Sequence, residues 1–369
     1  MNTVKSIFLV VGARPNFMKV APLQHQLAKR PEVFRTQLIH TGQHYDADMS
    51  DVFFQDLDLP QPHRFLGVGS GSHAEQTGKV MMAFEKVCVE ERPDLVIVVG
   101  DVNSTMACAV TAKKLCIPVA HVEAGLRSRD WSMPEEINRV VTDAISDLLF
   151  TPSRDADENL LREGVSSEKI HFVGNVMIDS LLTHLPKTEH RNILHKLGLR
   201  ENGYATLTLH RPSNVDDESV MTGILEVILE LSNQLPVVWP VHPRSRKNLE
   251  KMGLIDRIGN PPNLKLIDPV GYLDMLALNR FARVILTDSG GLQEEATVLG
   301  VPCVTLRHNT ERPVTVEVGA NRVAGSEPKK IREVLSFILG RNGHQIRVPE
   351  LWDGKAAERI VTVIDRLFS

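Results

Sequence analysis

The sequence is poor in aromatic residues and cysteine and has no excess of positive charge. Its 369 residues are 5% aromatic, and 42 lysines and arginines stand against 46 aspartates and glutamates, giving a formal net charge of -4. This balance leaves no basic surplus for a phosphate backbone, so no nucleic-acid partner is expected. No apolar run reaches the roughly 18 residues of a membrane span. The chain opens without a cleavable signal, so we expect a cytoplasmic protein with no membrane partner.

The four cysteines form no redox or metal motif. Cys88, Cys108, Cys116 and Cys303 are isolated along the chain, and their neighbours are mostly apolar. Isolated cysteines in such surroundings are typical of core residues. We therefore predict core thiols at these positions, the alternative being a redox or metal role.

Cofactor fingerprints are missing as well. There is no Gly-x-x-x-x-Gly-Lys-Ser/Thr loop, and the glycine-rich segment 67–72 fails the Gly-x-Gly-x-x-Gly pattern because Ser72 takes its last position. The 14 histidines include no His-Glu-x-x-His pair. Neither a nicotinamide cofactor nor a dedicated metal site is predicted.

Short apolar runs alternate with amphipathic stretches along the chain, which predicts an α/β fold with mostly parallel sheets. Strands are expected at 7–11, 36–41, 95–99, 118–122, 147–151 and 170–174, then at 204–209, 236–241, 263–268, 283–288 and 302–307. Helices are expected at 16–30, 73–91, 103–116, 134–147 and 153–163, then at 217–234, 244–252, 271–280, 290–300 and 328–340.

The length indicates two domains, because 369 residues exceed what one ordinary hydrophobic core supports. We predict two doubly wound Rossmann-like domains facing a cleft, comprising residues 1–174 and 175–352. A C-terminal helix over 353–369 fits either domain, and packing back on the first is one option. Such folds bind ligands at the carboxyl ends of their strands, so polar residues at these ends form the candidate site.

The first expected strand is followed by glycine and two cations. Gly12 comes directly after it, Pro15 suits the first position of a helix, and Arg14 and Lys19 flank that helix start. A helix N-terminus with two cations suits an anion such as phosphate. The alternative is a tight turn with solvated charges.

Carboxylates follow the next two core strands. Asp101 ends one strand, Glu123 ends the next, and Glu135 and Glu136 open a helix that also carries Arg139. Singly, the glutamates could be ordinary helix-start residues, and Glu135 and Arg139 could form a surface ion pair. Carboxylates gathered at one edge of a sheet would acquire separated pKa values, as general acid and base chemistry requires.

The second half has its own polar strand ends. His210 with Arg211, and His242 with Arg244, each follow a strand, where a histidine either carries a proton, donates to phosphate or caps a turn.

A further strand ends at Asp288, the turn Ser289-Gly290-Gly291 follows, and Glu294 and Glu295 lie in the first turns of the next helix. Glycines and free helix amides suit a diphosphate, and a carboxylate one turn further suits ribose hydroxyls. Arg312 could add a phosphate cation. The alternative is a structural turn.

These residues lie in motifs that resemble the non-hydrolysing UDP-N-acetylglucosamine 2-epimerases. The matching motifs cover nearly the whole chain: GARPNFMK, HTGQH, VGDVNST, HVEAGLRS, MPEEINR, TLHRP, PVHPR, LTDSGG with QEEA, and TERP. The resemblance implies a glycosyltransferase-B-like fold, a homodimer, and interconversion of UDP-GlcNAc and UDP-ManNAc.

The implied chemistry answers a physical difficulty, since no carbonyl acidifies the C2 hydrogen of a pyranose. Oxidation by NAD would need a site that the sequence does not contain. Elimination of UDP with loss of the C2 proton gives 2-acetamidoglucal, and UDP then adds back with protonation from the other face. No cofactor is required.

The resemblance also assigns roles to individual residues. It implies an acid/base set around C2 and the glycosidic oxygen, with a histidine at the diphosphate and sugar: Asp101, Glu123, Glu135 and His210. It implies substrate-binding residues for phosphate, sugar, diphosphate and ribose: Arg14, Lys19, Ser289, Gly290, Gly291, Glu295 and Arg312. Which carboxylate removes the proton stays open.

Three segments depart from the family's motifs. Residues 13–16 read Ala-Arg-Pro-Asn where Thr-Arg-Pro-Glu is usual, and the uridine-contacting stretch 270–275 lacks the Gln and Phe of many bacterial members. Bacterial members bind an activating second UDP-GlcNAc through Gln-His-Arg, whereas Gln43-His44 is followed here by Tyr45-Asp46, which leaves allosteric activation open. Relatives acting on a UDP-2,3-diacetamido uronic acid share HTGQH, MPEEINR and DPVGYL, so that sugar is an alternative substrate. A hydrolysing enzyme that releases ManNAc and UDP is another alternative.

Overall fold

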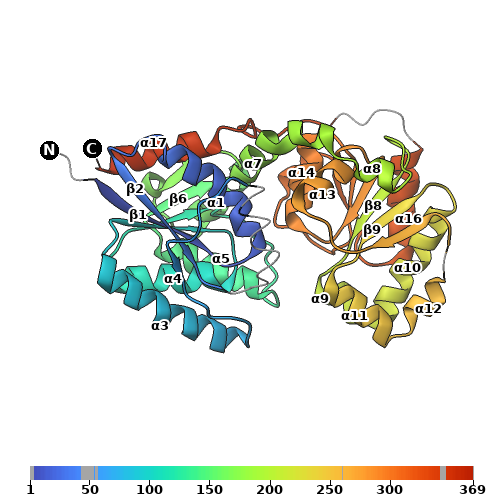
Figure 1. The fold of residues 1–369 in the computed structure, drawn as a ribbon, viewed down its shortest axis with the longest axis horizontal. Helices are drawn as coiled ribbons and strands as arrows, with labels where there is room; N and C mark the ends of the chain where they lie inside the picture. Colours follow the sequence, from blue (N-terminus) through green and yellow to red (C-terminus); the bar gives the residue numbers. More distant parts are fainter. Residues whose placement is uncertain (1–3, 43–53, 55–56, 260, 341–345, 369) are drawn as a thin grey trace. The chain divides into compact units, whose positions relative to one another are not determined.

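The computed structural model describes residues 4–42, 54, 57–259, 261–340 and 346–368 (Figure 1). The chain divides into two compact units: unit 1 comprises Met1–Thr183 and Glu350–Ser369, and unit 2 comprises His184–Pro349. Each unit is an α/β layer structure built on one parallel sheet. The predicted fold class, doubly wound parallel sheets, is confirmed.

The sheet of unit 1 has seven strands among the described residues, in the order β3-β2-β1-β4-β5-β6-β7, and every pairing is parallel. The strands are β1 (Lys5–Val11), β2 (Phe34–His40), β3 (Arg64–Phe65), β4 (Leu95–Val99), β5 (Val119–Val122), β6 (Leu148–Thr151) and β7 (Ile170–Phe172). The central strands are continuous apolar runs because helices cover both of their faces. The strand order reverses between β1 and β4, which is where doubly wound sheets bind ligands.

The helices of unit 1 lie on both faces of this sheet. They are α1 (Arg14–Leu27), α3 (His73–Glu91), α4 (Asn103–Lys114), α5 (Pro134–Ile145), α6 (Arg154–Arg162), α7 (Val176–His184) and α17 (Ala356–Phe368). Helices α1 and α17 pack side by side on one face, and α3, α4 and α5 lie on the other (Figure 1). Apolar residues such as Phe8, Phe84 and Val98 fill the layer beneath α3 and α4.

The sheet of unit 2 has six described strands in the order β10-β9-β8-β11-β12-β13, again all parallel. They are β8 (Ala205–Thr208), β9 (Val237–Pro240), β10 (Leu264–Ile267), β11 (Val284–Thr287), β12 (Cys303–Thr305) and β13 (Asn321–Val323). The helices are α8 (Ile193–Lys196), α9 (Pro212–Val215), α10 (Glu218–Ser232), α11 (Pro243–Lys251), α12 (Leu254–Ile258), α13 (Tyr272–Arg280), α14 (Gly290–Leu299), α15 (Val314–Glu317) and α16 (Pro328–Leu339).

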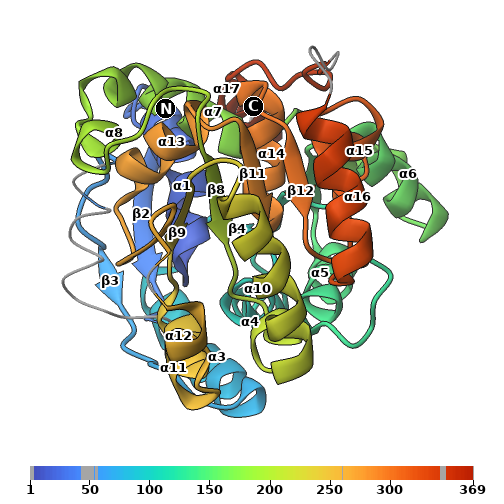
Figure 2. The same ribbon diagram turned by 90° about the vertical axis from the view of Figure 1, so that its right-hand side faces the viewer.

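Alternate residues of these strands face opposite helix layers. Trp239 and Leu286 pack beneath α10 and α16, which lie side by side in Figure 2. Val238 and Ile285 point the other way, into a cluster with Leu278 of α13 and residues of α14. The period of two in the strands thus separates two apolar layers.

The unit boundary lies at 183/184, nine residues later than the predicted 174/175. The physical reason is the anchoring of α7 to unit 1. Ser180 Oγ donates to the carbonyl of Met18, and the Asp179 carboxylate accepts from the amides of Ala356 (3.1 Å) and Ala357 (2.7 Å) at the start of α17. The same contacts hold the C-terminal helix on unit 1.

Two strands and one cysteine also differ from the sequence predictions. Strands β3 and β13 were not predicted, because β3 is two exposed residues long and β13 begins with Asn321-Arg322, which has no apolar run. Cys116 is exposed in the turn after α4, whereas Cys88, Cys108 and Cys303 are buried as expected.

In the described part of the chain, no helix is both long and apolar enough to cross a membrane.

Candidate active site

The start of α1 is fastened to the carboxyl end of β4 by Asn16. Its Oδ1 accepts from the amides of Gly12 and Ala13, both at 3.0 Å, and its Nδ2 donates to the carbonyl of Val99 at 3.1 Å. An amide supplies both functions, whereas an ionised carboxylate only accepts. Asn16, which stands where the family usually has a glutamate, therefore links the carboxyl ends of β1 and β4. Arg14 is the first residue of α1, and its side chain lies outside the described part of the structure.

Lys19 and Glu123 form a buried ion pair beside this turn. Lys19 lies one turn into α1, and Glu123 directly follows β5. The ion pair fits here because residue 100 is a glycine. A Cβ at Gly100 would lie 2.9 Å from Lys19 Nζ and 3.3 Å from Glu123 Oε2. Glu123 has a φ of 73°, a left-handed conformation that is uncommon outside glycine and recurs at functional sites.

Asp101 is paired with Arg139 at the next strand end. Arg139 donates to the Asp101 carboxylate and to Glu136 Oε2 (2.7 Å). Arg139 is buried, so the alternative interpretation of Arg139 as one half of a surface ion pair is wrong. The Asp101 side chain is 28% exposed, which leaves an ionised carboxylate within reach of a ligand.

Glu136 holds the loop that precedes α5. It accepts from the amides of Ser128 (3.0 Å) and Arg129 (2.9 Å). Burial opposes its ionisation, but hydrogen bonds from Ser128 and Arg139 lower the pKa of Glu136 below its ordinary value. Sequence reasoning passed over this residue in favour of Glu135, which is half-buried in the same helical turn. Adjacent helical residues point about 100° apart, so the two glutamates serve different surroundings.

In unit 2, Asp288 orients His210. The ring Nδ1 lies 2.7 Å from Asp288 Oδ1, while Oδ2 accepts from the amides of His210 and Arg211 at 2.9 Å. Burial opposes ionisation of Asp288, but His210 and these amides lower the pKa of its carboxyl. With Nδ1 held by Asp288, Nε2 of the 38% exposed His210 side chain is left for a ligand. The sequence placed Asp288 at a strand end but gave no sign of this pairing.

Helix α14 starts on the turn predicted to bind a diphosphate. The Ser289 amide donates to Thr287 Oγ1 (2.9 Å), so it is used within the protein. The amides of Gly290 and Gly291 lie in the first helical turn, where no intrahelical acceptor exists. A Cβ on Gly290 would lie 2.7 Å from Glu311 Oε1, so a side chain does not fit there.

A charge-balanced cluster backs this turn. Arg312 donates to Glu294 (2.7 Å) and pairs with Glu311, and Glu311 also pairs with Arg307 (2.9 Å). These side chains are buried, and so is Glu295 on the same helix. Arg312 is therefore held firmly against the glycine turn by carboxylates rather than extended into solvent.

His242 lies beside His210 in unit 2, and their ring centroids are 5.9 Å apart. His242 caps α11, with its Nδ1 accepting from the Arg244 amide at 3.2 Å. The segment Gln43-His44-Tyr45-Asp46 lies outside the described residues. Among the described residues no group of three or more histidine, cysteine or carboxylate side chains is arranged to hold a metal.

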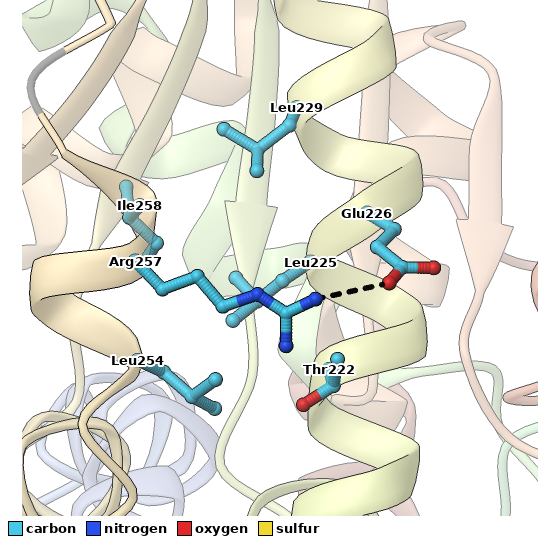
Figure 3. Close-up of a pocket in the computed structure, with 7 residues that line it drawn as sticks. All are labelled: Thr222, Leu225, Glu226, Leu229, Leu254, Arg257 and Ile258. Carbon is cyan, nitrogen blue, oxygen red and sulfur yellow. Dashed lines mark hydrogen bonds and ion pairs between the residues drawn. The ribbon is translucent and has the colours of Figure 1, made fainter.

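A surface hollow lies between α10 and α12 of unit 2 (Figure 3). Its walls are mostly aliphatic, and its charged members, Glu226 and Arg257, pair with each other at 3.4 Å. None of the predicted site residues lines it.

Doubly wound parallel sheets with carboxylates, a histidine and a glycine turn at their strand ends define an α/β enzyme of the glycosyltransferase-B-like class. The family model for UDP-N-acetylglucosamine 2-epimerase matches residues 25–365. The chain belongs to this family of isomerases.

Individual relatives agree. The chain is 44% identical over 361 residues to the UDP-N-acetylglucosamine 2-epimerase of Methanocaldococcus jannaschii, covering 96% of this chain and 98% of that protein. It is 42% identical over 339 residues to a UDP-2,3-diacetamido-2,3-dideoxy-D-glucuronate 2-epimerase of Pseudomonas aeruginosa, with 91% and 92% coverage. The crystal structure of the Methanocaldococcus jannaschii enzyme with UDP-GlcNAc and UDP has a TM-score of 0.90 and 43% identity, covering 98% and 99% of the two chains.

Proposed function

We propose that the protein is a non-hydrolysing UDP-N-acetylglucosamine 2-epimerase that interconverts UDP-GlcNAc and UDP-ManNAc. The family membership supports the reaction class, and the relative crystallised with UDP-GlcNAc and UDP supports the substrate. The observation that carries the proposal is the pair of ionised carboxylates at neighbouring strand ends, Asp101 on Arg139 and Glu123 on Lys19.

The proposed reaction is an elimination followed by a re-addition. A carboxylate removes the C2 proton, the C1–C2 double bond forms, and the C1–O bond breaks with its electron pair leaving on UDP. The intermediates are 2-acetamidoglucal and UDP. In the second step the UDP oxygen attacks C1, and C2 receives a proton on the opposite face.

Two faces of C2 require two proton carriers, and unit 1 offers three candidates. Asp101 pairs with Arg139 and Glu123 pairs with Lys19, so each carboxylate is held in place at its strand end. Glu135 is half-buried at the start of α5 and is the third member of the proposed set. Lys19 neutralises Glu123 at rest, and with Arg14 it is proposed to contact phosphate and sugar.

Unit 2 is proposed to hold the UDP. The amides of Gly290 and Gly291 suit the diphosphate, with Ser289 at the helix cap. Glu295 is proposed for the ribose hydroxyls and Arg312 for phosphate or sugar. His210 donates from Nδ1 to Asp288, and the imidazolium form of its ring donates from Nε2 to the diphosphate as charge develops on the leaving UDP.

Proton NMR in heavy water tests the proposal. Purified protein incubated with UDP-GlcNAc should introduce deuterium at C2 and produce UDP-ManNAc, with both sugars still attached to UDP. Stoichiometric accumulation of free UDP and ManNAc would instead indicate the hydrolysing reaction. Unchanged UDP-GlcNAc without C2 exchange would refute the proposed function.

A second substrate is supported by a specific relative. The Pseudomonas aeruginosa protein is named for a UDP-2,3-diacetamido uronic acid and is 42% identical to this chain. The same NMR experiment with that sugar separates the two, because the chemistry at C2 is shared and only the relative kcat/KM values differ. A larger kcat/KM for the uronic acid would identify that sugar, rather than UDP-GlcNAc, as the substrate.

We further propose that the enzyme is a cytoplasmic homodimer that serves polysaccharide biosynthesis. The support is the resemblance of its motifs to the family. Light scattering on the purified protein tests the dimer, since a single-chain mass would contradict it.

A further inference from the structure

A buried histidine connects the two strand ends that carry Asp101 and Glu123. His121 is the third residue of β5, and its side chain is fully buried. Its Nδ1 lies 2.6 Å from Asp143 Oδ1, and its Nε2 lies 2.8 Å from the carbonyl oxygen of Gly100. Gly100 immediately precedes Asp101, so one imidazole ring reaches the loops of both carboxylates.

Both partners of this ring accept hydrogen bonds. The Gly100 carbonyl has no proton to give, and the Asp143 carboxylate already accepts from the Gly125 amide (3.0 Å) and pairs with Arg127 (2.7 Å). A neutral imidazole has a single N–H, so it would point a lone pair at one of these oxygens. The geometry is satisfied when both ring nitrogens carry hydrogen.

The carboxylate at Nδ1 is ionised. Asp143 pairs with Arg127, and Arg127 pairs in turn with the partly exposed Glu163 at 2.6 Å, which also lies 3.8 Å from the exposed Arg129. Burial opposes ionisation of Asp143, but His121 and Arg127 lower the pKa of its carboxyl. Both oxygens that face the ring therefore accept hydrogen bonds.

We propose that His121 is a positioning residue that, as an imidazolium, fixes the separation of Asp101 and Glu123. It contacts the Gly100 carbonyl directly and the Gly125 amide through Asp143. These contacts restrain the backbone next to Asp101 and next to Glu123. The Gly125 turn has little freedom to adjust, because a Cβ there would lie 2.5 Å from the carbonyl of Ala156. The catalytic meaning of this role rests on the proposed function.

The protonation state is tested without substrate. In a two-bond proton–nitrogen correlation spectrum of the full-length protein with nitrogen-15-labelled histidine, both His121 ring nitrogens should have imidazolium shifts. Through-bond connectivity from the His121 backbone assigns the signal in the unmodified protein, and His121→Gln should remove it. One ring nitrogen at the position of an unprotonated nitrogen would overturn the proposal, whatever the enzyme's activity.

The positioning role is tested by the hydrogen isotope effect. His121→Gln should lower kcat about 100-fold. Its kcat ratio for UDP-GlcNAc with hydrogen or deuterium at C2 should rise above that of the unmodified enzyme, because misplaced carboxylates slow C–H cleavage. Loss of folded protein lowers the rate but leaves this ratio unchanged, so an unchanged ratio would overturn the role.

His171→Gln is the matched control. His171 lies on β7 of the same sheet, is half-buried, and its ring makes no hydrogen bond within the described residues. Its rate and isotope effect should stay as in the unmodified enzyme. If the unmodified enzyme leaves C2 untouched, the proposed function fails, while the nitrogen spectrum still decides the state of His121.

Discussion

Lys19 and Glu123 form a buried ion pair although 104 residues separate them in the sequence. One comes from the first helix and the other from the turn after β5, so the pair joins two strand ends of the same sheet. Because both side chains are shielded from water, each charge depends on its partner rather than on solvent.

Removing the lysine should therefore destabilise unit 1. We expect Lys19→Met to cost about 3–5 kcal/mol in the free energy of unfolding, because it removes one partner of a buried ion pair and leaves the charge of Glu123 in the interior. Urea unfolding measures this cost. The double variant Lys19→Met/Glu123→Gln should recover much of it, although it remains inactive. A double variant as unstable as the single one would contradict this account.

The matched control is Lys113, whose pair with Asp147 (2.8 Å) is about one-third exposed on both sides. Lys113→Met should cost at most about 1 kcal/mol, since water screens an exposed pair. Equal costs at positions 19 and 113 would show that burial does not set the strength of these pairs.

Gly290 should not tolerate a methyl group. A Cβ there would meet Glu311 and Arg312, which are buried and paired with each other and so cannot move aside cheaply. We expect Gly290→Ala to cost about 1–3 kcal/mol of stability and to weaken UDP binding, measured by calorimetry. Gly78→Ala, within α3 where nothing lies within 4 Å of the added carbon, should instead stabilise by about 0.5–1 kcal/mol.

Asp288→Asn should impair catalysis and change the acid stability. The neutral amide of asparagine cannot balance a positive charge on the His210 ring as the carboxylate does, so we expect kcat to fall about 100-fold. The folded pKa of Asp288 is lowered, so its contribution to stability is complete above the unfolded pKa of about 3.9 and is lost as the pH falls through the folded value. Urea midpoints below pH 5 should therefore fall more steeply for the unmodified protein than for Asp288→Asn. Parallel pH profiles would contradict the lowered pKa.

Local patterns predicted the regular elements well, and long-range contacts explain what was missed. Helix 73–91 was predicted at both ends, and in the structure Ser72 caps its start and the chain turns at Arg92, where φ is 44°. The strand over 95–99 was equally clear from its continuous apolar run. The roles of Glu136, Asp288 and His121 depend on partners that only the folded sheet brings near. Asp288, for example, binds the amide of His210 from 78 residues away.

Asp179 should make stability depend on pH in the opposite direction. Burial raises the pKa of its carboxyl to about 6, outweighing the amide hydrogen bonds from Ala357 and Ala356. Between the unfolded pKa of about 3.9 and this folded value, the folded state binds more protons than the unfolded state. Its contribution to stability should therefore fall as the pH rises from about 4 to about 6, by up to about 3 kcal/mol, and stay level above.

Asp179→Asn removes this titration while keeping an oxygen that can accept from the first turn of α17. As the pH rises through that interval, the unfolding free energy of the unmodified protein should therefore fall relative to that of the variant. Urea titrations at half-unit pH steps, followed by a probe in unit 1, measure the shift. A difference that stays constant between pH 4 and 7 would mean that the buried carboxylate at α17 ionises as readily as an exposed one.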